Sequence, residues 1–288
     1  MERVHIKFYK PNHLGATYQT DSTKVKLRGK FLKSRNQDMP TMLWFPEVME
    51  PAENWEKWLQ NSENKILDNR NVWLLNPRNF GDSDHHNSFD LEEVAHDIKR
   101  FIEENKLSIV TVGGHGYGAK IASAFGSYFY DKTSGVICLE GGPLDHTYYE
   151  SWQEVQAAIT TSSKIKLDNT SITDVHKKID SAVAHPKWRA ILKQNLIDGK
   201  SSLQWRFNME QLALNVKKQK SDIAGWSARY GLYPGRSFVL FAEFSRWIFL
   251  NTNTIPFYTF FPKLEGRFPS NNFNFVQTPD DPLSNIYL

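Results

Sequence analysis

The fold is decided by one stretch near the middle of the chain, Ile109-Val110-Thr111-Val112-Gly113-Gly114-His115-Gly116-Tyr117-Gly118. Its first four residues are apolar or β-branched, which predicts a buried strand. A glycine-rich turn follows, and apolar residues at helical spacing resume at Ala119 and continue to Tyr128. A buried strand that meets a helix through such a turn is typical of a parallel α/β sheet.

The segments on either side repeat this alternation. Short apolar runs predict further strands at residues 41–45, 72–75, 136–139, 238–241 and 257–261, and spacings of three and four predict a helix at residues 91–102. Before them, alternation at residues 4–8 and at Val25 and Leu27 predicts antiparallel strands. We therefore expect an α/β fold, with a mainly parallel sheet and helices on both faces.

Residues 148–229 show a different pattern. Four helices are expected there, at residues 152–159, 174–184, 186–196 and 209–218, with no strand of comparable strength between them. An all-helical insertion of this size predicts a cap over the edge of the sheet. The expected organisation is a first part of the core at 1–147, the cap at 148–229, and the last part of the core with a carboxyl tail at 230–288.

Composition excludes several classes of function. The net charge is +3, and no run of Lys and Arg exceeds two residues, so we expect no nucleic-acid contact. No apolar stretch approaches the roughly 20 residues of a membrane span. The single cysteine, Cys138, excludes an internal disulfide and is expected to be a small core residue. Asp84-His85-His86 is expected to be a solvated loop rather than a metal site, and no cofactor is predicted.

Several motifs carry a resemblance to a known family. The turn at Gly114, His115, Gly116, Tyr117 and Gly118, here called the elbow, resembles the nucleophile elbow of the α/β-hydrolase superfamily. The segments at residues 76–83, 139–143, 189–196 and 205–209 resemble other parts of one branch of that superfamily, so that the resemblance covers about residues 41–268. This branch contains bacterial esterases and a mitochondrial matrix esterase-like hydrolase. It implies the α/β-hydrolase fold.

The resemblance also implies where a catalytic triad would lie. Gly116 stands at the nucleophile position, Glu140 at an acid position and Arg267 at the base position, and the last histidine of the chain is His185. Glycine has no nucleophile and an arginine cannot act as a base. The family's oxyanion loop is replaced by Phe45-Pro46-Glu47, where the proline lacks an N–H donor. The sequence therefore predicts a catalytically degenerate member that is not an enzyme, and we expect that Gly116→Ser alone creates no esterase activity.

Two histidines near these motifs could be catalytic, but a structural role is expected for each region. His115 is expected to pack beneath the turn as a structural histidine. His85 and Asp90 have the H-x4-D spacing that some acyltransferases use, but Asp90 precedes a predicted helix and is expected to cap its first turn.

These observations predict a non-catalytic structural or accessory subunit of a larger assembly. The resemblance implies a mitochondrial assembly, such as a respiratory-chain complex, ATP synthase or the ribosome; otherwise the chain is expected in the cytoplasm. The partners are expected to be other protein subunits, bound through an aromatic cluster that could equally belong to the core: Trp247, Phe257, Tyr258, Phe260 and Phe261. The alternatives are a ligand-binding pseudo-hydrolase, which keeps an open pocket, and an active esterase or acyl hydrolase.

Overall fold

The computed structural model describes residues 25–218 apart from 62, 64, 148, 200 and 201, and then residues 223–225, 232–240 and 260. The strands expected at residues 4–8 and 257–261 lie outside this part, except for Phe260.

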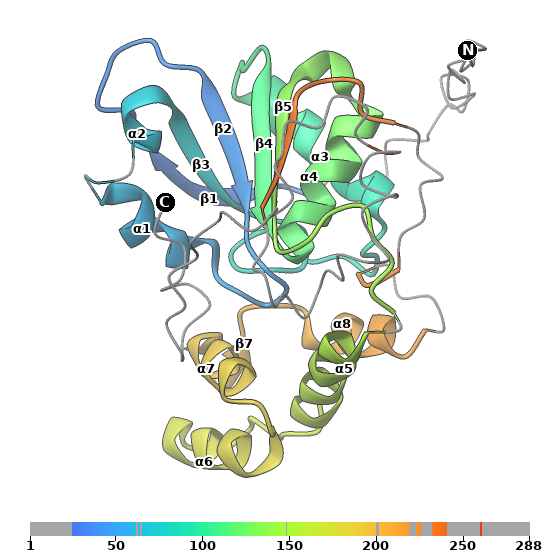
Figure 1. Ribbon diagram of the computed structural model, residues 1–288. Coiled ribbons are helices and arrows are strands. Elements are labelled where there is room, and N and C mark those ends of the chain that lie inside the picture. The colour runs from blue at the N-terminus through green and yellow to red at the C-terminus, as the bar shows by residue number, and fades with distance from the viewer. Residues whose placement is uncertain are drawn as a thin grey trace, which may run out of the picture.

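The centre of the fold is a sheet of six strands in the order β1-β3-β2-β4-β5-β8. β1 is antiparallel to β3, and the other neighbouring pairs are parallel, as predicted (Figure 1). The strands are β1 (Arg28–Leu32), β2 (Thr41–Phe45), β3 (Asn71–Asn76), β4 (Val110–His115), β5 (Thr133–Leu139) and β8 (Ser237–Leu240). The first described strand begins at Arg28, so the strand expected at Val25 and Leu27 is misplaced: these residues are buried in the segment that precedes it.

Helices cover both faces of the sheet. Successive strand residues point to opposite sides, so the apolar residues of one strand pack against helices on both faces. Leu43 and Phe45 pack in the larger core cluster with α3 (Leu91–Glu104) and α4 (Tyr117–Tyr128). Met42 and Trp44 face the smaller cluster, which includes residues of η2 (Ala52–Trp55), α1 (Glu56–Gln60) and α2 (Ile66–Asn69). The short helix η3 (Tyr130–Lys132) leads into β5. All six residues of β4 are buried, as expected of a central parallel strand.

The region predicted as a cap contains α5 (Glu150–Ser162), α6 (Ile172–Ala182), α7 (Pro186–Gln194) and α8 (Met209–Val216). It is not all-helical, because β6 (Leu196–Asp198) and β7 (Leu203–Trp205) form a small antiparallel ribbon after α7. The ribbon buries Leu196 and Leu203, and these runs are too short for periodicity to distinguish strand from helix.

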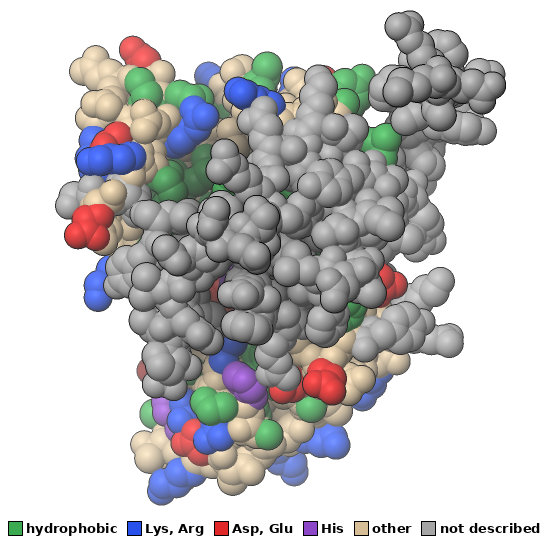
Figure 2. Space-filling model, in the orientation of Figure 1, with side chains coloured by type: hydrophobic (Ala, Val, Ile, Leu, Met, Phe, Trp, Pro, Cys, Tyr) green, Lys and Arg blue, Asp and Glu red, His purple; other side chains and the backbone are tan. Residues whose placement is uncertain are grey.

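Figure 2 shows basic and acidic side chains together on the visible face of this region.

The cap lies at the edge of the sheet where the parallel strands end (Figure 1). Asn195 donates to the carbonyl of Met49, in the loop after β2, at 2.7 Å. The backbone N–H of Asn208 donates to the carbonyl of Asn79, in the loop after β3, at 2.8 Å. The elbow at the end of β4 therefore lies beneath a lid of cap elements. No helix in the described part of the chain is long and apolar enough to cross a membrane.

Candidate active site at the elbow

Gly116 forms the turn between β4 and α4, with φ 55° and ψ −112°. Its N–H donates to the carbonyl of Leu139 at 2.8 Å, which ties the turn to the end of β5. The positive φ lies in a region that L residues adopt only under strain, so glycine suits this position. The predicted turn is confirmed.

Two backbone N–H groups converge on one point beside this turn. The N–H groups of Val48 and Tyr117, here called the N–H pair, donate to a single oxygen, Oε1 of Glu47, at 2.7 and 2.9 Å. Phe45 pairs with Gly114 across the sheet, and this register brings the loop after β2 to the elbow. Tyr117 is the first residue of α4, so the carboxylate also lies at the positive end of a helix.

The N–H pair has the geometry of an oxyanion hole, in which donors lie about 2.7–3.1 Å from the developing anion. The proline in the loop after β2 was expected to remove a donor. Pro46 has no N–H, but Val48, two residues further on, supplies the donor instead. The loop thus keeps a backbone donor at this turn despite the proline.

Glu47 also fills the space in which a side chain at position 116 would lie. A Cβ built on Gly116 would lie 1.8 Å from Oε2 of Glu47. Glu47 is 4% exposed, and its Oε2 has no hydrogen-bond partner among the described residues. A buried carboxylate oxygen thus occupies the place of the missing nucleophile. Sequence reasoning missed this residue, although an acid directly after the end of a central parallel strand was an available signal.

Gly116→Ser is expected to lower the free energy of unfolding by about 1–3 kcal/mol, because the new Cβ strains the backbone and meets Glu47. The family's histidine base is absent, with Arg267 at its position, so a fluorophosphonate probe is expected to leave the variant unlabelled. Chemical denaturation and intact mass spectrometry check the two parts. Labelling of the new hydroxyl by the probe would contradict this prediction and show that Glu47 or another nearby group can activate it.

The N–H pair opens onto a small pocket, here called the elbow pocket. Its room corresponds to about one water molecule. Ten residues line it: Glu47, Val48, Gly116, Tyr117, Lys120, Glu140, His146, Trp152, Ile223 and Ala224. The structure thus brings Glu140 to the same pocket as Gly116, as the family pattern implies, and adds Glu47, Lys120 and His146, to which the sequence analysis assigned no role.

Lys120 and Cys138 are two buried groups near the elbow whose pKa values shift strongly. Burial lowers the pKa of Lys120 to about 7, against the opposing charges of Asp145 and Glu47. Burial raises the pKa of the Cys138 thiol to about 12, against a hydrogen bond with Ser123. Cys138 is therefore an inert core residue, as predicted.

His115 lies under the turn, as expected of a structural histidine. Its Nδ1 is 3.7 Å from Oε2 of Glu50, and its ring packs 5.7 Å from that of Trp55. Burial by itself raises the pKa of Glu50, but the neighbouring imidazole of His115 brings it below the usual value. The pair supports the loop that carries Glu47, because Oε2 of Glu50 also accepts from the N–H of Glu47 at 3.2 Å.

Asp90 caps α3 by accepting from the N–H groups of Glu92 and Glu93, as predicted. His85 is exposed, and the described residues contain no group of three potential metal ligands. Phe260 is 1% exposed in the chain's own core, so this member of the aromatic cluster does not face a partner. Arg267 and the rest of that cluster, Trp247, Phe257, Tyr258 and Phe261, lie outside the described residues.

Comparison with curated proteins finds two proteins named as acetyltransferases among its matches. The chain is 23% identical over 130 residues to a probable alcohol acetyltransferase of Wickerhamomyces anomalus. The aligned region covers 44% of this chain and 37% of the relative. It is 22% identical to ethanol acetyltransferase 1 of Cyberlindnera fabianii, covering 44% of this chain and 38% of that one. The chain thus spans less than two fifths of the length of these relatives.

Solved structures with the same fold include several hydrolases. An esterase from a marine microorganism has a TM-score of 0.70 at 20% identity, covering 84% of this chain and 90% of the esterase. A carboxylesterase of Nitrososphaera gargenis has a TM-score of 0.59 at 13% identity, covering 86% and 87%. At these identities the likeness shows the fold.

The prediction of a non-catalytic structural subunit, and with it that the chain is not an enzyme, is corrected by these findings. The relatives are named as acetyltransferases and esterases, which points to an enzymatic function, and nothing among them indicates a subunit of an assembly. The prediction rested on Gly116, on Arg267 at the base position and on the proline in the loop after β2, and it took no account of a group supplied by another loop.

The family is shown by a match that spans most of the core and the cap. The family model described as alpha/beta hydrolase fold matches residues 45–233, from the end of β2 through the elbow and the cap. The order of the strands, the turn at Gly116 and the cap above it agree with that match. The chain belongs to the α/β-hydrolase fold family.

Proposed function

We propose that this chain is an acyl-transfer enzyme that acts on an ester or thioester, with Glu47 as its catalytic carboxylate. The observation that carries the proposal is the N–H pair, which holds one carboxylate oxygen at 2.7 and 2.9 Å, as it would hold the oxyanion of a tetrahedral intermediate. The names of the relatives, acetyltransferases and esterases, support the same class of reaction.

Substrate binding begins when the carbonyl oxygen of the acyl group replaces Oε1 of Glu47 at the N–H pair. That oxygen then accepts the hydrogen bonds of Val48 and Tyr117. Both donors are backbone groups fixed by β2, β4 and α4, so their orientation costs no reorganisation during the reaction. The freed carboxylate stays beside the carbonyl carbon, because its chain position is two residues beyond β2.

Gly116 offers no nucleophile, so the reaction proceeds by direct attack of a water molecule. The oxygen of the water bonds to the carbonyl carbon while Glu47 accepts a proton from that water. The oxyanion of the tetrahedral intermediate forms between the two N–H groups. The intermediate then collapses, the bond to the leaving group breaks, and Glu47 returns the proton to the departing alkoxide or thiolate. The products are a carboxylic acid and an alcohol or thiol; an alcohol in place of water gives a new ester.

The volume of the elbow pocket also limits the size of the acyl group that can bind. The described lining leaves room for about one water molecule beside the N–H pair, with Trp152 and Ile223 among its walls. Displacement of Glu47 adds the volume of a carboxylate. We therefore expect short acyl groups, such as formyl or acetyl, to be favoured over long chains.

Glu47→Gln tests the role of the carboxylate. The amide oxygen of the variant can still accept from the N–H pair, but the side chain cannot take a proton, so kcat/KM for a short-chain ester or thioester is expected to fall about 10²–10⁴-fold. The melting temperature is expected to stay close to that of the wild type. The matched control is Glu103→Gln, which removes an exposed carboxylate of α3 and should leave kcat/KM unchanged.

The outcomes separate clearly. A wild-type protein without turnover of formyl, acetyl and butyryl esters and thioesters contradicts the proposed function. An active wild type whose Glu47→Gln variant is equally active shows that the acyl chemistry uses another base.

A further inference from the structure

Lys120 is a buried cation that the proposed reaction has not used so far. It lies on α4, three residues after Tyr117, and is 1% exposed. Its Nζ donates to the carbonyl of Ala224 and lines the elbow pocket together with Glu47. Within the part of the chain that the structure describes, Lys120 forms no ion pair.

A buried ammonium of this kind is unfavourable for folding. Removing the charge from water opposes folding strongly unless a partner of opposite sign compensates it. One carbonyl acceptor is weak compensation, and a methionine would fill the same volume without this penalty. The carbonyl of Ala224 does not depend on the lysine, because it also accepts from the backbone N–H of His146 at 2.9 Å. Packing and hydrogen bonding therefore give no sufficient reason for a lysine at this position.

The proposed reaction creates a need for such a cation. Glu47 must leave the N–H pair before an acyl oxygen can enter, and its carboxylate then loses two hydrogen bonds in a buried site. The lining of the elbow pocket contains one Lys or Arg side chain among the described residues, that of Lys120. Lys120 is therefore the side chain of this described lining that can offer an ammonium to the carboxylate.

We propose that Lys120 is a positioning residue that receives the Glu47 carboxylate when an acyl substrate displaces it from the N–H pair. Glu47 then alternates between two partners: the N–H groups of Val48 and Tyr117 in the resting enzyme, and the ammonium of Lys120 in the enzyme with substrate. This inference rests on the proposed function and deepens it, because it makes entry of the substrate depend on the charge of one lysine.

The surroundings of Lys120 set the pH at which this charge is lost. Glu47, Glu140, His146 and Tyr117 are the titratable side chains that share its pocket, and the charge of Asp145 also acts on it. Burial outweighs the acidic groups and lowers the pKa of Lys120 to about 7. The ammonium is present below that pH and is lost above it, so kcat/KM is expected to fall as the pH rises through about 7.

Lys120→Met tests the proposal on the intact 288-residue chain. The variant is expected to lose about 10–100-fold in kcat/KM for a short-chain acyl ester at about pH 6 while its melting temperature stays equal or rises. The alkaline fall in activity with a midpoint near pH 7 should disappear from the variant. The control is Lys57→Met, which removes an exposed lysine of α1 and should change neither quantity.

A second measurement does not depend on activity. The pKa of Lys120 is lower in the folded chain than the 10.5 of the unfolded one, so the unfolded chain binds more protons between about pH 7 and 10.5. The wild type should therefore gain thermal stability over this range relative to Lys120→Met. A lower melting temperature in the variant, with the alkaline limb of activity retained, would mean a structural role and overturn the inference.

The remaining outcomes distinguish the two proposals. If Glu47→Gln is inactive but Lys120→Met has full activity and the wild-type pH profile, the acyl-transfer function stands and the inference about Lys120 fails. If the wild type turns over no acyl substrate, the proposed function fails, and the inference fails with it.

Discussion

Arg78→Met is expected to lower the free energy of unfolding by about 3–5 kcal/mol, because it leaves the buried carboxylate of Asp97 with only the 3.5 Å contact to Arg100 among the described residues. Arg78 and Asp97 are each 1% exposed. The guanidinium donates through Nε to Oδ2 of Asp97 at 2.7 Å and through Nη2 to Oδ1 at 3.0 Å. Burial alone lowers the pKa of Arg78, but Asp97 and Glu93 together raise it above its ordinary value, so the side chain stays charged.

Chemical denaturation of three variants checks this expectation. Lys30→Met, which breaks the exposed pair with Glu56, should change the free energy of unfolding by about 0–1 kcal/mol. The double variant Arg78→Met/Asp97→Leu should recover most of the loss, because an apolar pair of similar volume replaces the ion pair. A loss below about 1 kcal/mol in Arg78→Met would contradict the assigned role of the network.

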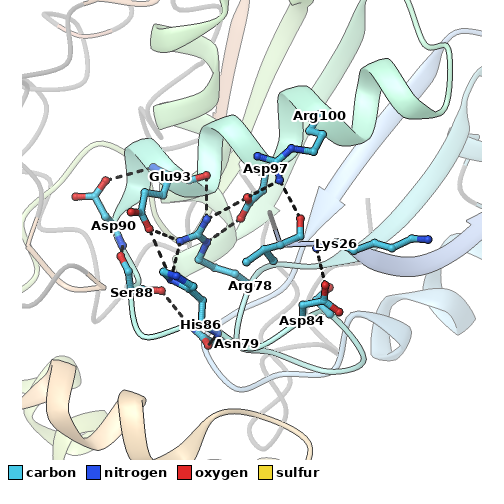
Figure 3. A network of polar contacts seen from close by, with 12 residues as sticks. Lys26, Arg78, Asn79, Asp84, His86, Ser88, Asp90, Glu93, Asp97 and Arg100 are labelled. Carbon is cyan, nitrogen blue, oxygen red and sulfur yellow. Dashed lines mark hydrogen bonds and ion pairs between the residues drawn. The ribbon is translucent and has the colours of Figure 1, made fainter. Parts of the chain in front are cut away.

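The network also connects the core to the cap. Figure 3 shows Arg78 between α3 and the loop after β3, where it contacts Glu93, Asp97 and His86. In the same loop, Asn79 accepts from the backbone N–H of Asn208, which caps α8, and from its side chain at 3.2 Å. Arg78 thus fixes a loop on which one end of the cap rests.

Gly118→Ala is expected to destabilise the chain by about 3 kcal/mol or more, because the new methyl group meets backbone atoms. A Cβ at this position would lie 2.0 Å from the carbonyl oxygen of Phe45 and 2.5 Å from its carbon. Neither atom can move unless α4 separates from β2, and that separation would also pull the N–H of Tyr117 away from that of Val48. Activity should therefore fall along with stability.

The matched control is Gly135→Ala in β5. Its Cβ would find the nearest atom, the carbonyl oxygen of Arg236, at 3.6 Å, an ordinary contact. Alanine in a strand costs less conformational entropy than glycine, so this variant should be as stable as the wild type or slightly more stable. Equal denaturation midpoints for the two variants would show that α4 and β2 are less tightly packed than their geometry indicates.

The two glycines of the elbow differ in the atoms that confront them. At Gly118 the obstacle is backbone, whereas at Gly116 it is the end of a glutamate side chain. A substitution at 116 can therefore be accommodated by moving Glu47, at the expense of the site. A substitution at 118 disrupts the fold itself.

The sequence by itself determined the parts of this protein that depend on neighbours along the chain. Apolar runs and helical spacing located the central strands and the helices, and the glycines marked the turn at residue 116. Asp90 was identified as a helix cap for the same reason, because its partners are the N–H groups two and three residues further on. Motif order was sufficient to identify the family.

Only the tertiary structure decided what lies around Gly116. Glu47 is 70 residues from Tyr117, and Lys120 is 104 residues from Ala224, so no local pattern reports that these groups meet. They meet because parallel strands end at one edge of the sheet, where the loop after β2 lies against the elbow. The sequence showed that a side chain was missing at position 116, and the fold placed a buried carboxylate from another loop in that space.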